Sequence, residues 1–339
     1  MNTLILNGEN REELNIASKI IKEGGLVAIP TETVYGLAAD GLNSNALKKI
    51  FEAKNRPMDN PLILHISKIE DIYRLTSDIK KEYIEILEKL WPGPLTVVLK
   101  KSTIIPKEVS AGLDTVAIRL PNKKLTRDFI ELCNTPLAAP SANLSTKPSP
   151  TSVSSVYEDM NGRIDAIIDG GSSEIGIEST VLDLTEDIPK ILRPGYYTKE
   201  ILEKYFKKVE LDIALKNKDE IPKSPGQKYK HYAPNTRVLV LIGDDESFRQ
   251  EVNKIISKNK NVGLMIFDND RDYFHIDNIV YMGKINNLDF MGSILFESLR
   301  DLDHKDLDLI IVRGVAEEGY GLSIMNRLKK SASGNVRRV

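Results

Sequence analysis

The sequence contains few of the residues that build cross-links and metal sites. Its 339 residues include one cysteine, four histidines and one tryptophan. A single cysteine, Cys133, excludes an intramolecular disulfide framework and a zinc site of several cysteines, which is typical of a reducing cytoplasm. Its apolar neighbours favour a buried thiol over a nucleophile. Because the histidines lack the spacing of metal ligands, we expect no protein-bound transition metal.

Long hydrophobic runs and an excess of one charge are also missing. Nowhere do about 18 apolar residues stand together, and the N-terminus lacks a basic segment followed by an apolar run. We therefore expect a soluble cytoplasmic protein without membrane contact. Lysine and arginine number 47 against 49 acidic residues, a net charge of -2. This balance gives no global argument for nucleic-acid binding, although binding through a local basic groove remains an alternative.

Several well-known catalytic motifs are absent. The sequence has no G-x-x-x-x-G-K-[ST], no H-E-x-x-H and no G-x-S-x-G. These absences argue against a P-loop NTPase, a zinc protease and a hydrolase with a nucleophile elbow. No G-x-G-x-x-G follows the strand expected at 238–242, so a dinucleotide role for that region has little support. The remaining chemistry is that of Lys, Arg, Ser, Thr and Asn side chains acting on oxyanions.

Helices and strands alternate along the chain, which predicts an α/β fold with two domains. The first, residues 1–211, is expected to hold a twisted mixed sheet with surrounding helices. The last, residues 236–339, is expected to be a small open-sheet, Rossmann-like α/β domain. Helices are predicted at 10–22, 45–53, 77–90, 125–132, 199–206, 247–257, 288–302 and 321–330. Strands are predicted at 26–30, 62–66, 95–99, 116–120, 137–139, 166–168, 180–184, 190–192, 238–242, 262–267, 279–282 and 309–312.

Between these domains, residues 212–235 lose apolar periodicity and contain three prolines. They are typical of an extended linker. The run Gln227 to Tyr232 carries two tyrosines and a histidine, which favours a segment that folds over a ligand; an inert tether is the alternative.

Two short polar clusters predict an anion site. Lys54 and Arg56 follow the helix at 45–53, where they can place a point charge and a planar fork over one small oxyanion. Simple capping of the helix C-terminus is the alternative. Ser141 and Asn143 follow the strand at 137–139, where hydroxyl and amide groups face a crevice.

Other candidates allow two interpretations. His65 closes a strand, and a lone histidine is more often structural than catalytic. Arg119 lies inside the apolar strand at 116–120, so it needs a carboxylate partner from the protein or from a substrate. Arg193 poses the same question at another strand end. The segment Pro30-Thr-Glu-Thr-Val-Tyr-Gly-Leu37 carries hydroxyls for a polar substrate, or forms a turn through local hydrogen bonds.

Taken in order, eight motifs closely resemble one family. They are PTETVYGL, FEAKNRPMDNPL, WPGPLT, VAIRLP, PLAAPSANLSTKPSPT, GIESTV, LRPG and SPGQKYKHYAP. This ordered set resembles the threonylcarbamoyl-AMP synthases in their two-domain form, which has a YrdC-like catalytic domain, and it covers residues 1–235 nearly throughout. The resemblance implies conversion of L-threonine, bicarbonate and ATP to threonylcarbamoyl-AMP and pyrophosphate. The product is implied to pass to the machinery that threonylcarbamoylates tRNA beside the anticodon.

The resemblance also implies roles for single residues. Lys54, Arg56, Ser141 and Asn143 are implied to be catalytic, holding phosphate and carbamate oxygens together. Threonine is implied to contact Thr33, His65, Arg119, Ala139 and Ser179, with Arg119 on its carboxylate. ATP is implied to contact Arg56, Asn60, Thr115, Ser141, Ser149, Arg193 and Tyr232. The last lies in the linker, which implies closure over the nucleotide. Mg²⁺ is expected to be held mainly by the ATP phosphates and water, since no carboxylate cage is evident.

Two rival functions remain open. An RNA-binding module would use the basic loop around Lys54 and Arg56 to follow phosphates, and direct tRNA binding is therefore an open question. A carbamoyl transferase acting on carbamoyl phosphate is the second rival, since YrdC-like folds occur within such proteins. The tyrosine-bearing linker and the lack of zinc-finger cysteines favour the synthase.

Overall fold

The computed structural model describes residues 2–212, 231–259 and 261–339. The chain divides into two compact units. The first takes the described residues of Met1–Ser145, Ser149–Glu174 and Glu178–Lys228, and the second takes those of Thr146–Pro148, Ile175–Ile177 and Tyr229–Val339. Of the predicted linker at 212–235, residues 213–230 lie outside the described residues.

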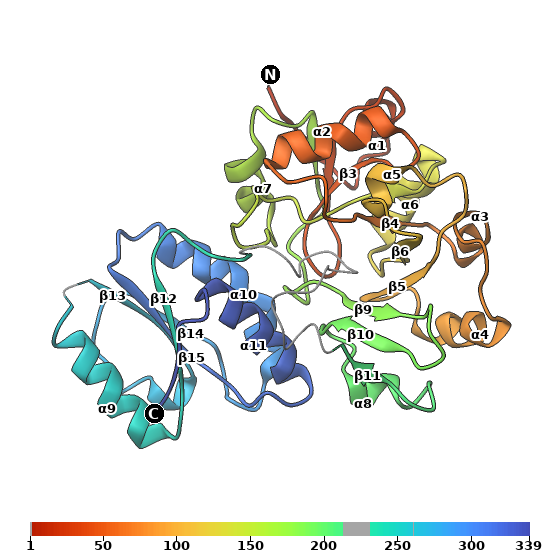
Figure 1. Cartoon of the computed structure of the whole chain (residues 1–339). Helices are drawn as coiled ribbons and strands as arrows, with labels where there is room; N and C mark the ends of the chain where they lie inside the picture. Colours follow the sequence, from red (N-terminus) through yellow and green to blue (C-terminus); the bar gives the residue numbers. More distant parts are fainter. Residues whose placement is uncertain (1, 213–230, 260) are drawn as a thin grey trace. The chain divides into compact units, whose positions relative to one another are not determined.

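The first unit is built on an eleven-stranded mixed sheet in the order β1-β8-β2-β3-β7-β4-β6-β5-β9-β10-β11 (Figure 1). Its strands are β1 Leu4–Asn7, β2 Val27–Ile29, β3 Gly36–Asp40, β4 Ile63–His65, β5 Leu95–Lys100, β6 Thr115–Arg119, β7 Leu137–Ala138, β8 Ala166–Asp169, β9 Thr180–Asp183, β10 Lys190–Arg193 and β11 Glu210–Leu211. Its helices are α1 Arg11–Lys22, α2 Ser44–Lys54, α3 Ile72–Leu75, α4 Lys81–Leu90, α5 Lys107–Ser110, α6 Lys124–Cys133, α7 Val153–Met160 and α8 Lys199–Leu202, with a 3₁₀ turn at Ile69–Asp71.

Local chemistry explains where the main helices begin and end. The side chain of Asn10 accepts a hydrogen bond from the Glu12 amide and begins α1, which ends before Gly24 at φ 77°. Asn43 begins α2 in the same way, and Asn55 ends it in the left-handed conformation at φ 51°. Asparagine suits both positions because its short amide caps free N–H groups and tolerates positive φ.

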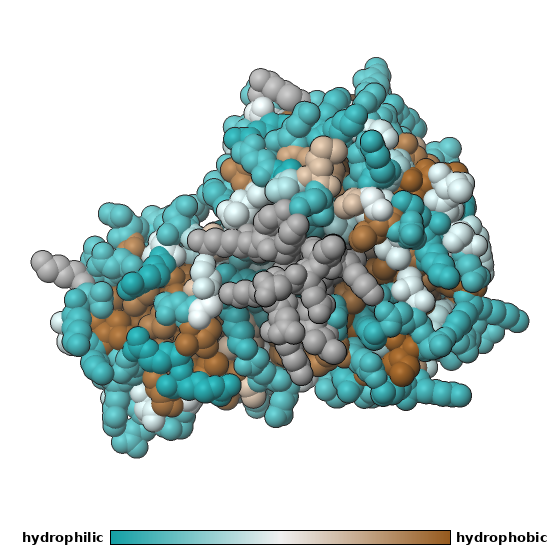
Figure 2. Space-filling view, viewed as in Figure 1, coloured by the Kyte–Doolittle hydropathy of each residue, from teal (hydrophilic) through white to brown (hydrophobic). Residues whose placement is uncertain are grey.

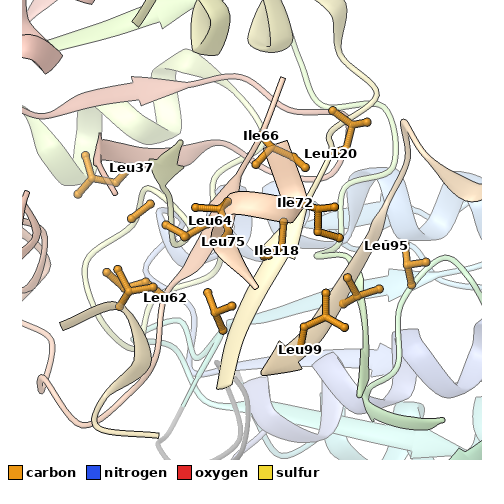
Figure 3. Packing of buried hydrophobic residues seen from close by; sticks show 14 of the residues in the cluster. Leu37, Leu62, Leu64, Ile66, Ile72, Leu75, Leu95, Leu99, Ile118 and Leu120 are labelled. Atoms are coloured by element: carbon orange, nitrogen blue, oxygen red, sulfur yellow. The ribbon is translucent and has the colours of Figure 1, made fainter. Parts of the chain in front are cut away.

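Alternation along the strands divides the first unit into layers. One face of the sheet contributes to a large core with α2 and α4, and Figure 3 shows part of it, from Leu37 and Leu64 to Ile118 and Leu120. On the other face, α1 and α6 pack over the strands near β1, β2 and β8. Cys133 lies in this second layer and is buried, as predicted; burial raises the pKa of its thiol to about 12.

The second unit contains a five-stranded sheet, parallel throughout, in the order β14-β13-β15-β12-β16. Its strands are β12 Val238–Ile242, β13 Val262–Ile266, β14 Ile279–Tyr281, β15 Leu309–Arg313 and β16 Val336–Arg338. Its helices are α9 Asp245–Ile256, α10 Leu288–Asp303 and α11 Tyr320–Ser331, with a 3₁₀ turn at Asp268–Asp270. Helix α9 lies on one side of this sheet, and α10 and α11 lie together on the other (Figure 1). The prediction of a mixed-sheet domain followed by an open Rossmann-like sheet is confirmed.

Hydrophilic side chains dominate the visible face of the described residues, with hydrophobic side chains showing between them (Figure 2). Among the helices that the structure describes, none is both long and apolar enough to cross a bilayer.

Candidate active site

One face of the central strands carries three of the predicted site residues, His65, Thr115 and Arg119. On β4, β5 and β6, every second residue leaves the large core and joins a separate apolar group, formed by Ile63, Val98, Ala117, Val181 and Leu192. The same alternation places His65 on this side of β4, Thr96 on this side of β5, and Thr115 and Arg119 at the two ends of this side of β6. We call this surface the site face. From Thr115 to Arg119 it spans about 13 Å at 3.3 Å per residue.

Arg119 is the centre of a buried charged group at one end of the site face. Its Nη1 donates a hydrogen bond to Oγ1 of Thr33 at 2.8 Å. Its Nη2 lies 2.8 Å from Oε1 of Glu32. The sequence required a carboxylate partner for Arg119, from protein or substrate, and the structure supplies Glu32 from the protein. Thr33, predicted with Arg119 as a threonine ligand, does lie beside it.

His65 lies next to Arg119, because the two residues pair in the parallel register of β4 and β6. Its Nδ1 is 3.3 Å from the carbonyl oxygen of Ile63. Burial, with the charge of Arg119, lowers the pKa of His65 to about 3. The imidazole is therefore neutral at neutral pH, and it can share hydrogen bonds with a ligand but cannot supply a positive charge.

Ser179 extends the Arg119 end of the site face. Its hydroxyl is 2.7 Å from that of Thr96, which is the cross-strand partner of Arg119. Arg193 donates from Nη2 to both the carbonyl oxygen and the hydroxyl of Ser179, at 3.0 and 3.1 Å. Arg193 was predicted with the ATP group, yet it contacts a predicted threonine ligand, so the two groups meet here.

Lys54 and the loop after β7 form the second cluster, as the anion-site prediction requires. The Lys54 ammonium donates hydrogen bonds of 2.5 Å to the carbonyl oxygens of Ser141 and Asn143. Lys54 ends α2 but contacts this loop, so simple capping of its own helix does not describe it. Burial, and then the charge of Arg56, lowers the pKa of Lys54 well below its ordinary value, while Asp159 opposes the shift.

The loop that Lys54 holds is tied to both neighbouring strands. The Ala139 amide donates to the carbonyl oxygen of Ile63 at 3.0 Å, and Ser141 forms a β-bridge with Gly36. Gly36 follows Thr33 by three residues, a reach of at most about 11 Å of chain. Lys54, Ser141, Asn143 and Ala139 therefore lie near the strands that carry the Arg119 group.

Two predicted ATP contacts lie in the basic loop after α2, and a third lies at the start of β6. Arg56 is half-buried, and its Nη2 donates to the carbonyl oxygens of Asn60 and Pro61 at 3.4 and 3.3 Å. Asn60 is buried, and its Oδ1 has no hydrogen-bond partner among the described residues. Thr115 lines an open cavity of about 560 Å³ together with Lys100 and Lys101. Asp114 lines the same cavity, so both signs of charge surround it.

Ser149 and Tyr232 are the remaining predicted residues. Ser149 is buried, and its hydroxyl donates to Oε1 of Glu178 at 2.6 Å. Tyr232 belongs to the second unit, where its buried ring stacks on Phe296 of α10 with ring centres 5.1 Å apart. Its backbone adopts φ 63°, which is strained for a residue with a side chain.

Three polar residues of the site were not singled out by sequence reasoning: Glu32, Thr96 and Glu178. Each contacts a predicted residue, namely Arg119, Ser179 and Ser149. Glu32 lies inside the Thr-Glu-Thr segment, in which the sequence indicates only the hydroxyls as ligands. The sequence signal that could have found Glu32 is Arg119, because a buried arginine needs a carboxylate partner. No group of three or more His, Cys, Asp or Glu side chains arranged for a metal occurs in the part of the chain that the structure describes.

Comparison with known proteins agrees with this architecture. Residues 19–195 match the Sua5/YciO/YrdC family, described as "Telomere recombination", and residues 197–333 match the family described as "Threonylcarbamoyl-AMP synthase, C-terminal domain". These matches define the chain as one of the two-domain proteins that join a YrdC-like unit to a C-terminal α/β unit.

Full-length relatives narrow this class. The threonylcarbamoyl-AMP synthase of Pyrococcus abyssi is 44% identical over 99% of this chain and 100% of its own length. That of Bacillus subtilis is 41% identical over 96% of this chain and 95% of its own. The crystal structure of P. abyssi Sua5 complexed with L-threonine matches with a TM-score of 0.93, at 42% identity and over 100% of both chains. The chain belongs to the threonylcarbamoyl-AMP synthase family, which consists of enzymes of the nucleotidyltransferase type.

Proposed function

We propose that this protein converts L-threonine, bicarbonate and ATP to threonylcarbamoyl-AMP, pyrophosphate and water. The observation that carries the proposal is the match to named synthases along the whole chain, combined with a site face whose polar residues suit two anionic substrates. The amine of threonine attacks bicarbonate carbon, water leaves, and a carbamate forms. A carbamate oxygen then attacks the α-phosphorus of ATP, and the bond to pyrophosphate breaks. No side-chain nucleophile is required.

Threonine is proposed to lie at the Arg119 end of the site face. Arg119 binds its carboxylate, and Thr33, His65, Ser179 and the backbone at Ala139 contact the rest. The Nε of Arg119 has no hydrogen-bond partner among the described residues, which leaves a buried donor for a ligand oxygen. A neutral His65 suits this place because it adds a hydrogen-bonding group without repelling Arg119.

Lys54, Arg56, Ser141 and Asn143 are proposed to be the catalytic residues. An ammonium has three donors, and two of them hold the Ser141 and Asn143 carbonyls. The third is available to a carbamate or phosphate oxygen, and an anion there would favour the charged lysine. Holding two anionic reactants together in this way supplies part of the roughly 7–11 kcal/mol that orientation offers.

ATP is proposed to contact Arg56, Asn60, Thr115, Ser141, Ser149, Arg193 and Tyr232. The contact of Tyr232 with ATP is proposed together with three parts of the chain. They are a catalytic domain at 1–211, a linker at 212–235 that folds over the active site, and a C-terminal domain at 236–339. Closure of such a segment excludes water from a product that hydrolyses readily.

Mg²⁺ is proposed to enter with ATP. The proposed catalytic side chains are cationic or neutral, and such groups suit phosphate oxygens better than a bare divalent cation. Mg²⁺ bound to the phosphates would neutralise charge on the leaving pyrophosphate. We further propose a cytoplasmic location and transfer of the product to the tRNA threonylcarbamoylation machinery.

Pyrophosphate release from ATP and bicarbonate, measured with and without L-threonine, tests the reaction directly. Mass detection of the adenylate adduct should accompany it. Threonine-dependent pyrophosphate and the adduct are expected without any RNA. Folded protein that gives neither product, but binds tRNA in a salt-sensitive way or consumes carbamoyl phosphate, would replace this proposal with one of its two rivals.

A further inference from the structure

The Glu32 and Arg119 side chains form an ion pair that is almost completely buried. Their side chains are 4% and 5% exposed, and Oε1 lies 2.8 Å from Nη2. Burial alone would raise the pKa of Glu32, but the charge of Arg119 opposes it and the net result is a lowered pKa. Glu32 is therefore a fixed negative charge against the residue that is proposed to bind the threonine carboxylate.

The backbone on both sides of Glu32 is held in place. The Thr31 hydroxyl donates to the carbonyl oxygen of Val34 at 2.6 Å and lies 2.9 Å from the Thr33 hydroxyl. The hydroxyl of Ser173 donates to the carbonyl oxygen of Thr31 at 2.9 Å. These contacts fix the backbone next to Glu32, and its buried carboxylate lies against Arg119.

The Arg119 guanidinium is oriented by two contacts on its terminal nitrogens. Glu32 lies against Nη2 and Thr33 accepts from Nη1, while Nε has no partner among the described residues. A guanidinium is planar, and it binds a carboxylate strongly only when two N–H groups point along the plane toward it. Contacts that set the plane therefore decide how well the remaining donors meet a ligand.

We propose that Glu32 is the positioning residue for Arg119, which it orients toward the carboxylate of the amino-acid substrate. This inference rests on the proposed function. Glu32 acts through Arg119, so its removal weakens threonine binding while ATP binding is retained. If Glu32 only neutralised the buried Arg119, its removal would affect folding. The KM for threonine relative to the KM for ATP would then stay unchanged.

Steady-state kinetics of Glu32→Gln and Glu32→Asp separate these two roles. The glutamine variant should raise the KM for threonine at least about tenfold while the KM for ATP changes less than about threefold. Aspartate keeps the charge on a shorter side chain, so that variant should recover part of the threonine affinity. The matched control is Asp270→Asn in the second unit, where Asp270 and Arg313 form another buried pair at 2.6 Å. It should leave the threonine KM unchanged.

A substrate without a carboxylate gives the sharper test. L-threoninol cannot use the Arg119 fork, so wild type and Glu32→Gln should process it at equal rates if Glu32 acts through that fork. If the glutamine variant does not fold, the same comparison is made with Glu32→Asp. Unchanged threonine KM in a folded variant, or an equal loss with threoninol, would overturn the inference. A wild type that makes no threonine-dependent pyrophosphate would instead refute the proposed function.

Discussion

The burial of His65 predicts how much unfolding free energy the protein loses as the pH falls. It is 3% exposed, and burial is the main cause that lowers its pKa to about 3 from an ordinary 6.5. The unfolded chain therefore binds a proton between pH 6.5 and 3 that the folded chain refuses. By linkage, stability rises with pH in this window, is complete above pH 6.5, and is lost as the pH falls through it.

The size of the loss follows from the two pKa values. Each pH unit in the window costs up to about 1.4 kcal/mol, so His65 alone should remove about 2 kcal/mol by pH 5 and about 3 kcal/mol by pH 4. His65→Gln abolishes this titration. The variant starts less stable or equally stable at pH 7, but it should lose about 2 kcal/mol less than wild type between pH 7 and pH 5.

Urea unfolding followed by tryptophan fluorescence measures this difference in the free energy of unfolding for the first unit, which contains His65. Trp91 is the chain's one tryptophan; it is buried in the first unit, with its indole donating to the carbonyl oxygen of Leu95 at 2.8 Å. Its emission therefore reports the unfolding of the unit that contains His65. His275→Gln is the control, because His275 is exposed and lies in the second unit. Equal acid losses in wild type and His65→Gln would refute the reasoning, since His65 would then titrate alike in both states.

Four further perturbations test other parts of the molecule. Arg56→Ala and Lys54→Met should each lower turnover at least about tenfold, or about 1.4 kcal/mol of transition-state stabilisation, and near-normal pyrophosphate release from both would exclude the anion site. Lys54→Met should also lower the unfolding free energy by about 1–3 kcal/mol, read from Trp91, because two carbonyls lose their donor. Deletion of 236–339 should leave some activity, and its complete loss from a folded remainder would give that segment a direct role. Serine should replace threonine with a kcat/KM lower by about 10–200-fold, because it lacks one methyl group.

Much of the fold was predictable because the apolar residues of many helices and strands recur at the spacing expected for that element. Helix α1 and strand β12 lie where the sequence placed them. Strand β3 was missed, since Gly36-Leu-Ala-Ala-Asp40 is buried on both faces and shows no polar alternation. The helix expected from residue 77 begins at Lys81, because the Ser77 amide bonds to the carbonyl oxygen of Lys100 and so extends the sheet. The end of α8 at Leu202, short of residue 206, is a similar overestimate.

The contacts of Lys54 illustrate what sequence reasoning about the site can and cannot provide. Charge and spacing indicated that Lys54, Ser141 and Asn143 serve one site, and the structure brings them together across 87 and 89 residues. The form of the contact was not predictable, because the lysine binds backbone carbonyls, and every residue has one. Side-chain identity therefore predicts which residues gather, while backbone contacts decide how they are held.

Glu32, at the Arg119 end of the site face, was not predictable from the sequence alone. The sequence required a carboxylate for Arg119 and offered 49 acidic residues. The Thr31–Thr33 turn joins the antiparallel strands β2 and β3, and β7 and β4 lie between β3 and β6 in the sheet. The contact of this turn with Arg119 therefore depends on a strand that was missed. Once β3 is known, Glu32 is placed by the same turn that supplies Thr33. The partner of a buried charge is thus a property of topology, and it becomes predictable only after the sheet order is known.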